Sequence, residues 1–226
     1  MDSNYVTNME RLNGIMWHLE CIALARKEIE KFRPPADLFR IRVYYSLYVT
    51  NLMSVIDFIL EIYKGDFQEA LEKQLKTSHH SGEDVLGYVR ELRNGIVHRG
   101  LDPTAGALVK SGIVYVVAKP VTNRSGAKIY SAPALFLRDI LLHTDISARP
   151  VIERFLERTF EEIVSIPLEE IIEIYSKIIE KTAHMPEWAK KISHSNTPKE
   201  TLEIAIRYQI SKCRELLQPP MGQRII

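Results

Sequence analysis

Five polar side chains gather in one short stretch of the sequence, and their types suggest chemistry. They are Arg90, Arg93, Asn94, His98 and Arg99. A histidine gains or loses a proton near neutral pH, and an arginine offers a fixed, planar set of donors that matches a phosphate. The group is therefore suited to proton transfer at a phosphate ester.

The stretch 83–100 is predicted to be an amphipathic helix that presents these side chains. Ser81 and the two acidic residues after Gly82 suit a helix start, and Gly100 suits a helix end. His98 is then expected in the last turn. Apolar residues return at helical spacing and should face a core: Val85, Leu86, Val89, Leu92, Ile96 and Val97.

The spacing within this helix separates the polar residues. Asn94 and His98 are four residues apart and share a face, so Asn94 can orient the imidazole. Arg93 and His98 are five apart, a rotation of roughly 140° in a straight helix. Arg93 must therefore reach around the helix or meet the histidine of a different subunit. Gly95 weakens the helix between them and permits a local bend.

The run from Arg93 through Asn94 to His98 resembles the signature of the HEPN superfamily, an arginine and a polar residue followed at a short interval by a histidine. That resemblance implies an all-α, often dimeric protein, and many members are metal-independent endoribonucleases. It implies that Arg93 and His98 are catalytic and that Asn94 supports them, with two copies of the motif meeting across a homodimer. One branch of this superfamily, a group of toxins, has a tyrosine two positions after the histidine. Gly100 stands there, so modification of such a tyrosine is not expected.

RNA cleavage of this kind needs a base for the 2′-hydroxyl proton, an acid for the leaving 5′-oxygen and positive charge at the phosphate. His98 can serve as acid or base, and Arg93 can bind the non-bridging oxygens. Arg90 and Arg99 are expected to add contacts to RNA phosphates, and Asn94 to hold the tautomer. No cofactor or metal is needed for this chemistry. DNA lacks the 2′-hydroxyl and should survive.

A purely structural interpretation of the same residues stays open. In that interpretation His98 and Arg99 only favour the helix end electrostatically, and Arg93 pairs with Glu91, Glu83 or a carboxylate on another helix. At the level of function, the alternative to a ribonuclease is a non-catalytic nucleotide- or nucleic-acid-binding dimerisation module. A role in phage defence or as a toxin, with an antitoxin or other regulatory protein as partner, is implied by analogy alone.

Composition describes an ordinary globular chain with free thiols. Its 226 residues are 46% hydrophobic and 26% charged, and 30 basic against 29 acidic side chains leave a net charge of +1. RNA affinity must therefore come from a local patch. Cys21 and Cys213 lie far apart, and no Cys/His spacing resembles a zinc site. We find neither a leader nor an apolar run of membrane-spanning length, and expect a cytoplasmic protein without a membrane partner.

The predicted fold is mainly α, a HEPN-like helical bundle with a small β-hairpin insertion and additional C-terminal helices. Helices are expected over 9–32, 37–64 and perhaps 66–76 before the motif, and over 147–165, 168–181 and 197–217 after it. In the insertion, near 107–132, residues 112–118 should pair with 127–130 around a turn at 122–126. A domain of residues 1–145 would be followed by an extension of residues 146–226, separate or packed on the same core.

Overall fold

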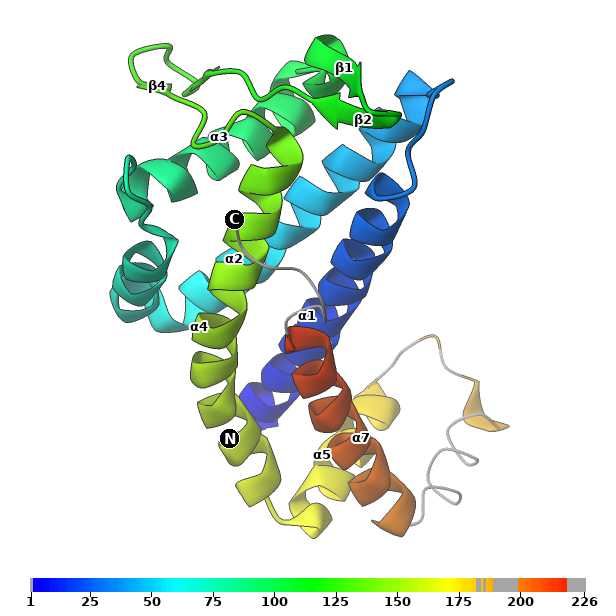
Figure 1. Ribbon diagram of the computed structural model, residues 1–226. Helices are drawn as coiled ribbons and strands as arrows, with labels where there is room; N and C mark the ends of the chain where they lie inside the picture. The colour runs from blue at the N-terminus through cyan, green and yellow to red at the C-terminus, as the bar shows by residue number, and fades with distance from the viewer. Residues whose placement is uncertain (1, 182–183, 185, 189–198, 219–226) are drawn as a thin grey trace.

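The computed structural model describes residues 2–181, 184, 186–188 and 199–218 and is mainly helical, as predicted. Its helices are α1 (Asp2–Ile29), α2 (Leu38–Leu75), α3 (Gly82–Arg99), α4 (Leu137–Ser165), α5 (Leu168–Lys181) and α7 (Lys199–Leu217). Short strands lie beside α3 and the start of α4, at the top in Figure 1, while α5 and the start of α7 lie at the lower end.

Helix α2 is the centre of the bundle. It runs antiparallel to α1 and packs against α1, α3 and α4 (Figure 1). Asp37 caps its start by accepting hydrogen bonds from the backbone nitrogens of Phe39 and Arg40 at 2.9 and 3.3 Å. The helix is interrupted at Lys64, where φ is 45°, next to the break expected at Gly65. Its buried side chains include Tyr45, Tyr48, Leu52, Val55 and Ile59.

One sequence expectation about α2 is wrong. An 18-residue stretch of this helix is long and apolar enough to cross a membrane, whereas the sequence was expected to contain no such run. Half of that stretch is buried inside the protein, as in the core helix of a bundle. The apolar character of α2 is thus used for packing against its three neighbouring helices.

Helix α3 has the ends that its sequence predicts. The Ser81 hydroxyl accepts a hydrogen bond from the Asp84 backbone nitrogen at 3.1 Å, and Gly100 is left-handed at φ 68°. At its first residue, α3 touches the end of α2. A Cβ added to Gly82 would lie 1.7 Å from the carbonyl oxygen of Glu72. Only a glycine therefore allows this approach of the two backbones.

The predicted hairpin is wrong in its pairing. The segment forms two separate two-stranded ladders, β1 (Ala107–Lys110) with β2 (Ile113–Val116) and β3 (Val121–Thr122) with β4 (Ile129–Tyr130). Ser111 and Gly112 both have positive φ, the geometry of a tight two-residue turn. Gly112 was expected to begin a strand. The expected turn at 122–126 connects β3 to β4 and is present.

The C-terminal helices pack on the same hydrophobic core as the first three. Helix α4 begins at Leu137, well before the expected start at 147, so Pro150 lies inside it and the expected boundary at residue 145 falls within a continuous helix. One cluster of buried apolar side chains extends from Met9 to Leu217. Helix α7 packs against both α1 and α4. Thr197 and Pro198, where the last helix was expected to begin, lie outside the described residues.

Candidate functional site

Arg93 and His98 line the same pocket, although they are five residues apart on one helix. The pocket has a volume of about 310 Å³ and lies where α1, α2 and α3 meet. Helix α3 contributes Arg93, Val97 and His98. The remaining lining residues are His18 of α1 and Thr50, Ser54, Asp57, Phe58 and Glu61 of α2.

Arg93 reaches this pocket by extending toward α2. Its Nη2 donates a hydrogen bond to Asp57 Oδ2 at 2.6 Å, and its side chain is one quarter exposed. The length of the arginine side chain thus compensates for the angle between positions 93 and 98. A carboxylate on another helix was one of the structural partners considered for Arg93, and Asp57 is that partner. The other N–H groups of the guanidinium can still bind an anion.

Asp57 has an unusual electrostatic environment for a half-exposed carboxylate. Burial raises the pKa of the Asp57 carboxyl, while Arg93 and Arg90 act in the opposite direction and only partly offset that effect. Its charged form is therefore less favourable than in water. Asp57 holds Arg93 in place at an electrostatic cost.

His98 lies in the last turn of α3 and is exposed. Within the described residues it forms no hydrogen bond to another protein group. An exposed, unpaired imidazole beside a pocket is free to contact a ligand.

Asn94 has a partner other than His98. Its amide nitrogen donates to Glu91 Oε1 at 3.2 Å, one turn earlier on the same helix. Arg99 also folds back onto Glu91, donating to its backbone carbonyl at 3.0 Å and to its carboxylate at 3.3 Å. Asn94 and Arg99 are thus gathered around Glu91. Arg90 is half-buried and affects Asp57 electrostatically.

His18 of α1 also lines this pocket, although it was not among the site residues predicted from the sequence. Its Nδ1 lies 2.6 Å from Oδ1 of Asn51, and the Asn51 amide nitrogen donates to the Leu47 carbonyl at 2.6 Å. The ring also lies 5.6 Å from that of Phe58. The one available signal was Asn51, a polar residue inside the apolar stripe of α2.

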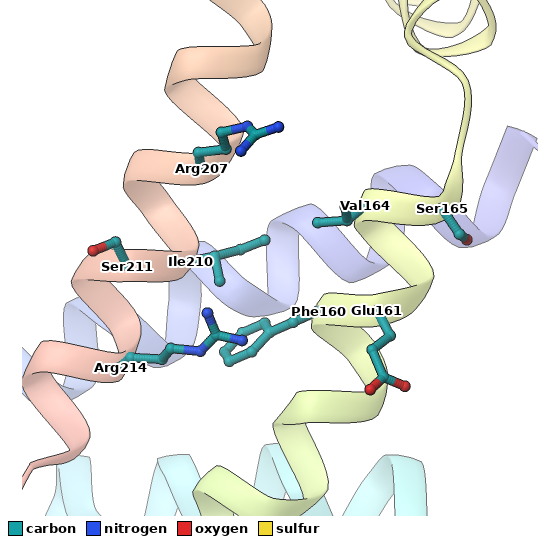
Figure 2. Close-up of a pocket in the computed structure, with 8 residues that line it drawn as sticks. All are labelled: Phe160, Glu161, Val164, Ser165, Arg207, Ile210, Ser211 and Arg214. Atoms are coloured by element: carbon teal, nitrogen blue, oxygen red, sulfur yellow. The ribbon is translucent and has the colours of Figure 1, made fainter.

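A second, larger cavity of about 670 Å³ lies between α4 and α7 (Figure 2). Its floor is apolar, and Figure 2 shows Ile210 and Val164 extending toward one another across the gap. The two arginines at its edge are paired: Arg207 with Glu203 at 2.7 Å and Arg214 with Glu157 at 2.6 Å. In the part of the chain that the structure describes, no histidine or other proton-transfer pair lines this cavity, so the first pocket is the better candidate site.

Among the described residues, no three His, Cys, Asp or Glu side chains are grouped closely enough to hold a metal ion. Comparisons with protein-family models, with curated proteins and with solved structures each found no match to this chain. The interpretation of the pocket therefore depends on its own residues and geometry.

Proposed function

We propose that this chain is a metal-independent endoribonuclease of the HEPN type. The observation that supports the proposal best is that Arg93 and His98, the two residues on which the family resemblance depends, line one pocket. Arg93 binds the non-bridging phosphate oxygens and His98 transfers a proton, as a polar pocket with these groups allows. The products are a 2′,3′-cyclic phosphate, or its hydrolysed 3′-phosphate, and a 5′-hydroxyl.

The partners belong to the same proposal. The substrate is RNA, with Arg90 and Arg99 near its phosphates and Asn94 in a supporting role. The active form is a homodimer, and the protein acts in the cytoplasm, where Cys21 and Cys213 remain the free thiols described here. A role in phage defence or in a toxin–antitoxin system, with an antitoxin or other regulatory protein, follows from the resemblance.

The test uses purified full-length protein, single-stranded RNA and an excess of EDTA. Wild type should cleave RNA and leave DNA of the same sequence intact. His98→Ala and Arg93→Ala should each reduce cleavage by a factor of about 10² or more. His79→Ala, an exposed loop substitution, is the matched control and should be fully active. Equal cleavage by wild type and His98→Ala would remove the proposal.

A second candidate function is favoured by the Arg93–Asp57 ion pair. Asp57 offsets part of the charge of Arg93 and so weakens the stabilisation of the extra negative charge in the transition state, whereas the remaining guanidinium N–H groups can still donate to the phosphate of a bound nucleotide. A nucleotide-binding module of this kind would bind a mononucleotide, with weaker binding by Arg93→Ala, and would leave RNA intact. Calorimetric titration with nucleotides beside the cleavage assay separates the two functions.

A further inference from the structure

The pocket contains two histidines from one chain, His18 of α1 and His98 of α3. Cleavage of RNA by internal attack needs two proton transfers, one from the 2′-hydroxyl and one to the 5′-oxygen. The family resemblance supplies one histidine per chain. The second histidine of this pocket comes from a helix that the motif does not include.

The hydrogen bonds around His18 determine which of its nitrogens carries a proton. The Asn51 amide nitrogen is committed to the Leu47 carbonyl, so the amide oxygen faces the ring. An oxygen accepts, and the neutral ring must therefore carry its hydrogen on Nδ1. Its Nε2 then has the free lone pair that a general base needs.

His18 and His98 are held in different ways. His18 is half-buried, fixed by Asn51 and packed near Phe58, whereas His98 is exposed and lies in the last turn of α3. The other charged groups that face His18 in the pocket are Asp57 and Glu61 of α2 and Arg93 of α3. Arg11 of α1 lies 3.6 Å from Glu61.

We propose that His18 is the general base and His98 the general acid of the same chain, acting on an RNA phosphodiester bound in the pocket. This inference rests on the proposed ribonuclease function. His18 Nε2 takes the 2′-hydroxyl proton while O2′ forms a bond to phosphorus. The bond from phosphorus to O5′ breaks with its electron pair, and His98 gives its proton to O5′. Arg93 binds the non-bridging oxygens throughout.

The test compares two substrates. One is ordinary RNA, and the other has sulfur in place of the bridging 5′-oxygen, so its leaving group needs no acid. His98→Ala should cleave ordinary RNA slower than wild type by a factor of about 10² or more. On the sulfur substrate its rate should return most of the way to that of wild type. His18→Ala should lose a similar factor on both. His79→Ala is the control with an altered histidine outside the pocket.

A second variant separates chemistry from packing at position 18. His18→Gln keeps an amide that can donate to Asn51 but has no group that titrates near neutral pH. Its melting temperature should be close to that of wild type, and its cleavage activity should still be as low as that of His18→Ala. The dependence of kcat/KM on pH gives an independent readout. In wild type kcat/KM should rise with pH on the acidic side of the profile as the base loses its proton, and in His18→Ala and His18→Gln this rise should be absent.

Each outcome has a distinct meaning. Full activity of His18→Gln with loss in His98→Ala overturns the role of His18 and leaves the ribonuclease proposal standing. If the cleavage rate of the His18 variants recovers on the sulfur substrate, His18 is the acid, and its assignment as the base is overturned. A wild type that cleaves neither substrate overturns the function and this inference together.

Discussion

Arg93 of α3 and Asp57 of α2 form an ion pair, with 2.6 Å between Nη2 and Oδ2. It connects the motif helix to the central helix directly at the pocket. The carboxylate fixes the guanidinium and at the same time places a negative charge beside the proposed phosphate position. The pair is therefore the feature whose removal is most informative about the site.

Asp57→Asn should change how stability depends on pH. The folded-state pKa of Asp57 is raised above the ordinary value of 3.8, chiefly by burial. Between the unfolded and folded pKa values the folded state binds more protons, so the contribution of Asp57 to stability is lost as pH rises. The free energy of unfolding of wild type minus that of Asp57→Asn should fall as the pH rises above the ordinary value of 3.8, as measured by urea denaturation at a series of pH values.

Asp102→Asn is the matched control with the opposite sign. The pKa of Asp102 is lowered by hydrogen bonds from Thr104 and by Arg42. Its contribution to stability is present above the unfolded pKa and is lost as pH falls. The advantage of wild type over this variant should therefore stay level above about pH 5 and shrink as the pH is lowered below about 4. Parallel curves for the two variants would contradict the environment described for Asp57.

Mixing two inactive variants tests whether the histidine pair acts within one chain. His18→Ala and His98→Ala would be combined, unfolded and refolded together so that any dimers exchange subunits. With both histidines in one chain, each subunit of a mixed dimer lacks one group, and cleavage should stay at the level of the single variants. If the two groups instead met across a dimer, about a quarter of the wild-type activity would return by subunit statistics.

The start and end of α3 were predictable from sequence because local contacts determine them. Ser81, Asp84 and Gly100 lie within one turn of the ends that they define, and the structure confirms all three. The pairing of the short strands was not predictable in the same way. β1 is largely exposed and carries little apolar alternation, and the one local signal for its pairing with β2 was the Ser111-Gly112 turn, which was interpreted as the start of a strand.

The site was predictable only in part, for a related reason. Arg93, Asn94 and His98 share one helix, and their spacing is visible in the sequence. His18 and Asp57 are brought to them by the packing of α1 and α2, which periodicity alone does not specify. The position of α4 shows the same limit, since burial of Leu137, Ile140 and Leu141 extends the helix upstream of Pro150.

Substitution of Asp145 should be among the most destabilising changes in this chain. Its carboxylate is 1% exposed and accepts from Arg149 Nε at 2.7 Å and from the Tyr48 hydroxyl at 2.9 Å. Arg149 also bonds to the Leu216 carbonyl at the end of α7, so the group joins α2, α4 and α7. Asp145→Ala leaves the buried Arg149 cation without its carboxylate partner, which costs about 3–5 kcal/mol.

The matched control is Arg207→Ala, which breaks the exposed Arg207–Glu203 pair on α7. Exposed pairs contribute about 0–1 kcal/mol to stability. The midpoint of urea unfolding of this variant should therefore be close to that of wild type. Similar unfolding midpoints for Asp145→Ala and Arg207→Ala would show that the buried group does not hold the C-terminal helix to the bundle.

Gly82→Ala should destabilise the junction of α2 and α3, and Gly65→Ala should not. An added Cβ at position 82 would meet the Glu72 carbonyl oxygen at 1.7 Å, and backbone atoms on both sides must move to relieve the contact. Overpacking of this kind costs about 1–3 kcal/mol or more. At Gly65 no atom lies within 4 Å of the new Cβ. Urea unfolding of both variants measures the difference. Equal stability of the two variants would contradict the close approach of the helices.

The same pair of variants affects activity, because α3 carries Arg93 and His98. RNA cleavage should fall in Gly82→Ala and persist in Gly65→Ala.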